Sequence, residues 1–236
     1  MKRISFFIGM LLSISNLVSQ EKISKQENAI GINEINIELK FAKNIQIKNS
    51  TDNQVSIEAE VNINENKDNH YFSLKTKKTN QKLSINSDYG DLFKKNKNKQ
   101  HYYCDNCTNG SQLTTNYVVY IPKNKTLKLE SISGNVDITE YNGMLTLDLI
   151  SGNITVKNHS KEMNLKTISG DIDVFVDDAT FKAETLSGTI YSNLDIDFNN
   201  QNKNSGATNK ISGLVKNGTA SLTMKTISGN VFLRKI

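Results

Sequence analysis

The chain contains two cysteines, Cys104 and Cys107, in a Cys-Asp-Asn-Cys motif. In an exported protein the favoured state of such a pair is a disulfide that pins a small loop. Zinc would need two more ligands, and the chain offers only His101 nearby and His70 and His159 farther away. A thioredoxin-like redox pair lies at a helix start in a βαβ unit, a pattern that is not visible in this sequence. We therefore predict a disulfide, with a metal site and a redox pair as the alternatives.

Carboxylates could cleave a polysaccharide, because glycosidases use paired acids about 5–9.5 Å apart. Asp137 and Asp173 fall in one outward column of the repeats, with Thr155 between them. Two steps of the inter-strand spacing separate them by about 10 Å, wider than such a pair needs. The only arginine outside the leader is Arg234, at the end of the chain. We therefore predict a solvated outer face, no catalytic residue and no enzyme activity.

The charge balance is mildly basic. The formal net charge is +5, and removal of Lys2 and Arg3 with the leader lowers it to +3. This value is too small to predict nucleic-acid binding. On the outer face, Lys166 and Glu184 are expected to stack one repeat apart as an opposite-charge pair. The glycine-rich nonapeptide of calcium β-rolls is missing, so we predict no cofactor.

Five copies of one short phrase, a bulky aliphatic residue followed by Ser-Gly, run through the second half of the chain. The first four are spaced by 18 residues, and the fifth comes later. Glycine supplies the backbone freedom of a tight bend, and a Cβ there would crowd the repeats above and below. We therefore predict that each pair forms a corner between two short strands. The corner residues are Ser133, Gly134, Ser151, Gly152, Ser169, Gly170, Ser187, Gly188, Ser228 and Gly229.

Apolar residues alternate on both sides of each corner, which is the period of a β-strand. We predict five buried aliphatic columns, with residues 18 positions apart lying over one another. One repeat cannot bury its apolar face alone, so the stack carries the stability. The predicted fold is all-β, a single-stranded β-solenoid with coils of about 18 residues, and a two-sheet β-prism or sandwich is the alternative. One predicted buried column consists of Ile132, Ile150, Ile168, Leu186 and Ile227.

The residue after most corners is Asn or Asp, at Asn135, Asn153, Asp171 and Asn230. These side chains can hydrogen-bond nearby backbone or form a polar ladder along the stack. At the end of the last strand, Arg234 is followed by another cation. We expect these two charges to protect an exposed sheet edge from pairing with other chains.

Residues 1–20 have the pattern of a secretory signal peptide, with two basic residues before an apolar run and a small, polar exit. The run is shorter than the ~20 residues of a spanning helix, so we predict no transmembrane span after signal removal. Residues 21–116 are predicted to form N-terminal β coils or a cap, with a Lys/Asn-rich, cysteine-bearing loop at 93–116. Residues 117–236 are predicted to form the regular repeats.

A resemblance adds to this interpretation. The strand from Tyr117 to Pro122, the following LKLESISGNVDI, the repeated SGN or SGD phrases and the closing ISGLVKNG and LTMKTISGNVFLRK resemble the putative adhesin β-strand-repeat family, a head-GIN-like bacterial extracytoplasmic domain. The resemblance covers roughly residues 30–236 and is clearest from 117 onward. It implies a right-handed β-solenoid exported to the cell envelope, with a role in adhesion or envelope maintenance. It carries over no catalytic residues, and the cysteine-bearing loop departs from its pattern.

Together these features predict a non-enzymatic structural or binding module of the cell envelope. A flat surface with its own regular spacing suits repetitive ligands, so the expected partners are envelope glycans or surface proteins. The expected location is the periplasm, the outer surface or the medium. An envelope-stress sensor and a polysaccharide-active enzyme are the alternative functions.

Overall fold

The computed structural model describes residues 21–95, 107–108, 111–158, 161–196 and 209–236. About 66% of the described residues lie in strands. The helical elements among them are a four-residue helix, α1 (Leu92–Lys95), and a short 3-10 turn, η1 (Asn69–Tyr71). The all-β expectation is therefore confirmed. Within the described residues, no helix combines the length and apolar character needed to cross a membrane.

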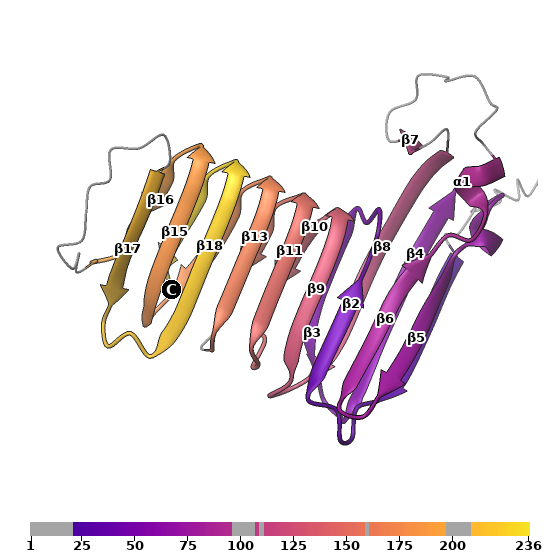
Figure 1. The fold of residues 1–236 in the computed structure, drawn as a ribbon, viewed down its shortest axis with the longest axis horizontal. Coiled ribbons are helices and arrows are strands. Elements are labelled where there is room, and N and C mark those ends of the chain that lie inside the picture. The colour runs from indigo at the N-terminus through magenta and orange to yellow at the C-terminus, as the bar shows by residue number, and fades with distance from the viewer. Residues whose placement is uncertain (1–20, 96–106, 109–110, 159–160, 197–208) are drawn as a thin grey trace, which may run out of the picture.

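The strands form two sheets that face each other along the long axis of the molecule (Figure 1). The ten-stranded sheet has the order β1 (Glu21–Asn28), β4 (Gln54–Ile63), β8 (Ser111–Pro122), β3 (Asn44–Ser50), β10 (Asn135–Ile138), β12 (Ile154–Val156), β14 (Ile172–Val176), β19 (Val231–Lys235) and β16 (Ile190–Ser192), with β7 (Cys107–Thr108) paired to β8. The nine-stranded sheet has the order β17 (Asn209–Val215), β15 (Ala179–Ser187), β18 (Ala220–Ser228), β13 (Met163–Ser169), β11 (Leu145–Ser151), β9 (Thr126–Ser133), β2 (Glu34–Glu38), β6 (Lys82–Asp88) and β5 (Ser73–Thr79).

In the middle of the molecule the chain alternates between the sheets, so that β9, β11 and β13 lie in one sheet and β10, β12 and β14 lie in the other. The pairs are parallel, and Leu127 lies beside Leu145, which lies beside Met163. The register of these strands therefore equals the 18-residue spacing of the sequence. Both ends are different, because β4, β5 and β17 pair antiparallel with their neighbours, which makes both sheets mixed.

The fifth copy of the repeat lies between the third and the fourth. Ser228 pairs with Ser169 on one side and with Ser187 on the other. The reason is β17, which pairs antiparallel with β15 and occupies its outer edge, so that β18 enters on the inner edge. The expectation that Lys166 and Glu184 stack directly is therefore wrong. Lys225 lies between them and forms the ion pair with Glu184, at 3.1 Å.

This insertion also changes the edge of the ten-stranded sheet. Strand β19, with Arg234 and Lys235, lies between β14 and β16. The expectation that these two charges protect an exposed edge is therefore wrong, because the edge strand is β16, which has only three residues. At the opposite end the edge strands are β1 and the lysine-rich β5, and short or charged edges resist pairing with other chains.

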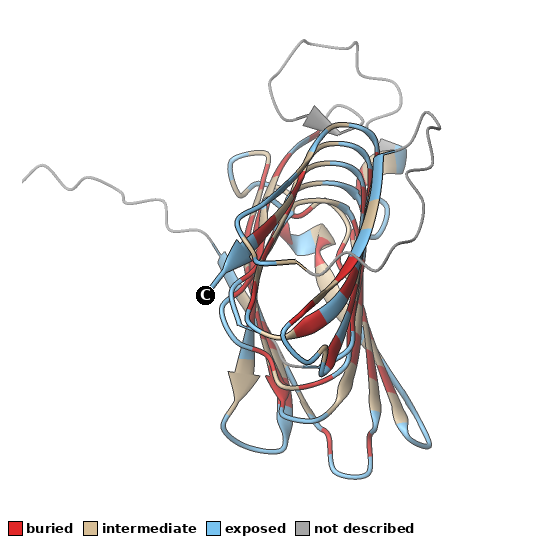
Figure 2. Ribbon diagram, turned by 90° about the vertical axis from the view of Figure 1, so that its left-hand side faces the viewer, coloured by how far each residue is buried: buried red, intermediate tan, exposed pale blue. Residues whose placement is uncertain are grey.

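The core lies between the sheets, on the faces they turn toward each other (Figure 2). Four of the five predicted aliphatic columns point inward there, and at the corner of each of the first three copies Val136, Ile154 and Ile172 are fully buried. At the open N-terminal end the two edge strands are linked, because Thr76 Oγ1 of β5 donates a 2.8 Å hydrogen bond to Glu27 Oε1 of β1. This contact closes one end of the core.

The predicted burial of the column before the serine is wrong. Its members are 38–51% exposed: Ile132, Ile150, Ile168, Ile227 and Leu186. The alternation of the strand explains this, because the preceding residue already points inward. That inward position holds Ser131, Leu149, Thr167, Thr226 and Thr185, all buried.

Three threonines of that inward position bond to the glycine of an adjacent corner. Thr167 Oγ1 donates to the Gly152 carbonyl at 3.1 Å, and Thr226 Oγ1 donates to the Gly170 carbonyl at 2.9 Å. Thr185 Oγ1 makes the same bond to the Gly229 carbonyl at 2.8 Å. The hydroxyls thus tie three repeats to the corners beside them, whereas Leu149 fills the same position of the second copy with an aliphatic side chain.

Candidate functional site

The corner residues lie where the chain passes from the nine-stranded to the ten-stranded sheet. Gly170 shows why glycine is needed there: its φ is +152°, and a Cβ on it would overlap the carbonyl group of Gly152 in the adjacent repeat. A side chain at this point would push two repeats apart. The corners thus set how closely successive strands approach, and so fix the rows of side chains on the outer faces.

A row of polar side chains crosses the outer face of the ten-stranded sheet next to these corners. In the repeats, each side-chain oxygen accepts a hydrogen bond from the backbone N–H of the next repeat in space. The distances from backbone nitrogen to side-chain Oδ1 are 3.0 Å from Asn153 to Asn135, 2.8 Å from Asp171 to Asn153, 2.7 Å from Asn230 to Asp171 and 3.0 Å from Thr189 to Asn230. The row continues through Asn44, Asn116, Glu60 and Lys22 to the far edge.

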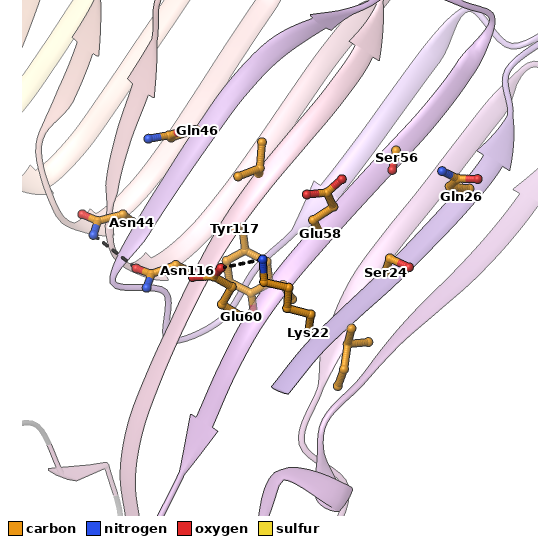
Figure 3. Close-up of a pocket in the computed structure, with 13 residues that line it drawn as sticks. Lys22, Ser24, Gln26, Asn44, Gln46, Ser56, Glu58, Glu60, Asn116 and Tyr117 are labelled. Atoms are coloured by element: carbon orange, nitrogen blue, oxygen red, sulfur yellow. Dashed lines mark hydrogen bonds and ion pairs between the residues drawn. The ribbon is translucent and has the colours of Figure 1, made fainter. Parts of the chain in front are cut away.

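At this far end the outer face is hollowed over β1, β4, β8 and β3 (Figure 3). The hollow has a volume of about 610 Å³. Each strand contributes alternate, outward-pointing residues, because side chains of a strand alternate between faces. The outward-pointing residues that line it include Ser24, Glu58, Val118, Gln46, Ser56 and Gln26.

Two pairs along one side of the hollow are already engaged. Asn44 Nδ2 donates to Asn116 Oδ1 at 3.2 Å, and Lys22 Nζ lies 3.4 Å from Glu60 Oε1 (Figure 3). Within the described residues, Glu58, Gln46 and Ser24 have no side-chain hydrogen bond or ion pair. A carboxylate, an amide and a hydroxyl thus lie in one row across the hollow, with the apolar Val118 between Gln46 and Glu58. Such a mixture of acceptors, donors and an apolar patch fits a ligand that carries many hydroxyl groups.

The two aspartates considered as catalytic acids lie in one row across the parallel strands, with Thr155 between them, as predicted. Asp173 is engaged by a cation, since Arg234 Nε donates to its Oδ1 at 2.7 Å. This pairing raises the pKa of Arg234. The arginine also lies over the ring of Phe232, with 5.1 Å to the ring centroid. The arrangement holds β19 to β14 and leaves Asp137 without a partner acid.

The predicted cysteine site cannot be placed in the structure. Cys104 and His101 lie outside the described residues, as does the signal peptide at 1–20, and of Cys107 only the backbone of β7 is described. The disulfide therefore stays a prediction. Among the described residues, no group of three or more His, Cys, Asp or Glu side chains could hold a metal ion.

The sequence did not point to the hollow. Its residues come from four strands between positions 22 and 118, three of which are neighbours only through antiparallel or long-range pairing. Ser24 and Glu58 are 34 positions apart but face each other in register. The one available signal was the alternation of polar with apolar residues in β4 and β8. This alternation predicts which side chains point outward, but it does not predict which strands lie next to each other.

Comparison with solved structures places the fold beside a putative cell adhesion protein from Clostridium sporogenes. The identity is 12% and the TM-score is 0.62, and the match covers 92% of this chain and 100% of that chain. A putative adhesin from Bacteroides fragilis matches at 11% identity and a TM-score of 0.33, over 93% of this chain and 99% of the other. No curated protein matches the chain. Residues 123–234 match the model of the Toastrack DUF4097 family, so the resemblance of the repeat region to a putative adhesin family of unknown function is confirmed.

Proposed function

We propose that this protein is an exported, non-catalytic binding module of the bacterial cell envelope, and that the hollow over β1, β4, β8 and β3 binds a hydroxyl-rich glycan. The observation that carries the proposal is the row of Glu58, Gln46 and Ser24, three polar side chains that line the hollow without side-chain partners in the described chain. Carboxylate and amide groups bind sugar hydroxyls directly, and Val118 offers an apolar contact to a sugar ring.

The geometry of the whole sheet supports a repetitive ligand. The rows of the outer face step from strand to strand by about 4.8 Å, so a polymer lying along the face meets similar groups at regular intervals. We also propose that the two sheets are the walls of a right-handed β-solenoid with coils of about 18 residues. The alternation of β9 to β14 between the sheets, in parallel register, supports this interpretation. Likeness to the Clostridium sporogenes protein supports it at the level of fold.

Export is part of the proposal. Residues 1–20 have the signal-peptide pattern of two basic residues before an apolar run. An envelope glycan or a surface protein is then the accessible partner. The protein without its leader is expected in the periplasm, on the cell surface or in the medium. Fractionation of cells that express the intact chain tests this location directly.

The binding test uses the exported protein on an array of bacterial cell-wall polysaccharides and peptidoglycan fragments. Binding to one glycan class is expected, and Glu58→Gln should weaken it by about tenfold, the value of one hydrogen bond to a charged group. Asp137→Asn is the matched control, because it makes the same change on the same face outside the hollow. A second variant, Ser24→Trp, fills the hollow from an exposed edge strand and should abolish binding.

Three results would overturn the proposal. The first is retention of no glycan from the array by a folded protein. The second is glycan binding that Glu58→Gln and Ser24→Trp leave unchanged. The third is turnover of a polysaccharide, which would make the protein an enzyme.

A further inference from the structure

An exposed row of aliphatic side chains runs along one margin of the nine-stranded sheet, where each of its strands approaches a Ser-Gly corner. We name it the aliphatic ladder. It contains, in spatial order, Ile132, Ile150, Ile168, Ile227 and Leu186. Nine large hydrophobic side chains are exposed in the described chain, and five of them form this one row.

Folding does not require aliphatic residues at these positions. The inward position beside them is filled by Ser131, Leu149, Thr167, Thr226 and Thr185, so the core is complete without the ladder. Contiguous exposed apolar residues rimmed by polar ones mark a surface that another molecule covers.

The row of side chains next to the ladder changes sign along the stack. On the five strands of the ladder it contains Glu130 on β9 and Asp148 on β11, followed by Lys166 on β13, Lys225 on β18 and Glu184 on β15. The sign change falls between Asp148 and Lys166, which also divides the ladder between Ile150 and Ile168. The two side chains before this point are thus acidic and the two after it are basic, and Glu184 pairs with Lys225 at the far end of the basic half.

We propose that the aliphatic ladder is the contact surface of a symmetric dimer of this chain. A two-fold axis at the sign change sets two ladders antiparallel and brings Ile150 against Ile168 of the second copy. The same rotation brings Asp148 of one copy to Lys166 of the other. Surfaces joined by a two-fold axis must be self-complementary in this way, and the two ladders have the same spacing of about 4.8 Å per strand.

The charges favour a second copy over an anionic lipid surface. The row beside the ladder holds both signs, and a second copy turned about the two-fold axis pairs Glu130 with Lys225 and Asp148 with Lys166. Anionic headgroups would attract the two lysines but repel the two carboxylates. The five half-exposed side chains alone form a smaller contact than the ~800 Å² per partner of a standard interface. The dimer is therefore reversible and depends on protein concentration.

The dimer goes beyond the proposed function and does not rest on it, because the ladder and the hollow lie on different sheets. Its consequence for binding is valency. Two copies joined along the nine-stranded sheets leave both ten-stranded sheets open, so one dimer presents two hollows. Two linked sites bind a repetitive ligand far more strongly than one site when the geometry lets both engage.

The first test measures self-association of the exported protein by sedimentation velocity over a range of concentrations. A monomer–dimer equilibrium is expected, and the double variant Ile150→Ser/Ile168→Ser should raise the dimer dissociation constant by about tenfold or more, because it removes two central apolar contacts. Met144→Ser is the matched control. Met144 is 46% exposed and directly precedes the start of β11, the strand that carries Ile150 near its other end, and its replacement should leave the dissociation constant unchanged.

The second test uses charge reversal, with melting temperature recorded to show that each variant folds. Asp148→Lys alone and Lys166→Asp alone should each weaken the dimer, since each places like charges across the two-fold axis. The double variant Asp148→Lys/Lys166→Asp restores opposite charges across that axis and should restore dimerisation.

Three other results would overturn the proposed dimer. A chain that stays monomeric at every concentration has no such dimer. Self-association that the ladder variants leave unchanged uses another surface. A monomer that binds vesicles of phosphatidylglycerol and phosphatidylethanolamine through the ladder, and loses this with Ile150→Ser/Ile168→Ser, would identify the ladder as a lipid contact.

Discussion

Asp171 Oδ1 accepts a hydrogen bond from the backbone N–H of Asn230 at 2.7 Å, although the two residues are 59 positions apart in the chain. The polar row that joins the repeats therefore runs from the third copy to the fifth, and from there to Thr189 of the fourth. The fifth copy of the repeat completes both features, with Asn230 in the polar row and Ile227 in the aliphatic ladder. Without β18, Ile168 and Leu186 would be separated by a gap.

Substitution at the third corner should destabilise the protein by a few kcal/mol. In Gly170→Val the new Cβ overlaps the backbone of Gly152, in addition to the strain of a positive φ. Gly31→Val is the matched control, because Gly31 also has a positive φ but no atom within 4 Å of an added Cβ. Thermal unfolding should show a clearly lower melting temperature for Gly170→Val than for the control. Equal melting temperatures would contradict the corner assignment.

Removal of one buried hydroxyl should cost about 1–3 kcal/mol of unfolding free energy. Thr226 is 1% exposed, and Thr226→Val keeps its shape but leaves the Gly170 carbonyl without this donor. Thr223→Val, on the outward side of the same strand, should change stability by less than about 0.5 kcal/mol. Urea unfolding of both variants measures the difference. A stable Thr226→Val would mean that the hydroxyl is not needed at this inward position.

Stability should fall as the solution becomes alkaline. Burial raises the pKa of Tyr141, whose hydroxyl donates to the Lys125 carbonyl at 2.7 Å. In the unfolded chain a tyrosine loses its proton near pH 10. The stabilising contribution is therefore complete below pH 10 and is lost as the pH rises above that value toward the higher pKa of the folded state.

The urea midpoint measured from pH 8 to pH 11 tests this dependence. Tyr141→Phe should flatten the decline above pH 10. Tyr191→Phe, in which the substituted ring is 51% exposed, should leave the decline as it is in the parent protein. An identical decline in all three proteins would show that Tyr141 does not contribute to it.

Neutralising Asp173 should have a small effect on stability. The ion pair with Arg234 is partly exposed, and such pairs contribute about 0–1 kcal/mol. Asp173→Asn should therefore shift the melting temperature only slightly and leave glycan binding in the hollow intact. An activity assay on polysaccharides provides the sharper readout, because loss of a measurable turnover in Asp173→Asn would assign this carboxylate to catalysis.

The sequence predicted the local pattern of the repeats well, because the period of a strand and the need for glycine at a corner are short-range effects. The 18-residue register of Leu127, Leu145 and Met163 follows directly from them. Whether a side chain faces the core or the solvent was harder to predict next to the corner. Ile150 was predicted to be buried because it is aliphatic, whereas the count of alternating positions from Leu145 places it outside.

Long-range order was the part that the repeats could not determine. Equivalent copies offer equivalent edges, so nothing in the phrase around Ser228 distinguishes the edge of the third copy from that of the fourth. The antiparallel strand β17 makes the choice, by covering the outer edge of β15. The hollow was unpredictable for a related reason, since Ser24, Glu58 and Gln46 meet only after four strands have paired.

The order of the repeats is the claim on which the continuous ladder and the polar row both depend, and disulfide trapping tests it most directly. In a background with Cys104 and Cys107 replaced by Ser, the pair Lys166→Cys/Lys225→Cys lies on adjacent strands, within the Cα separation of about 4.4–6.8 Å that a disulfide needs. The pair Lys166→Cys/Glu184→Cys lies two strands apart, at about 10 Å. Rapid oxidation of the first pair and not of the second is the expected result. Oxidation of the second pair and not of the first would show that the repeats stack in chain order and would contradict this structure.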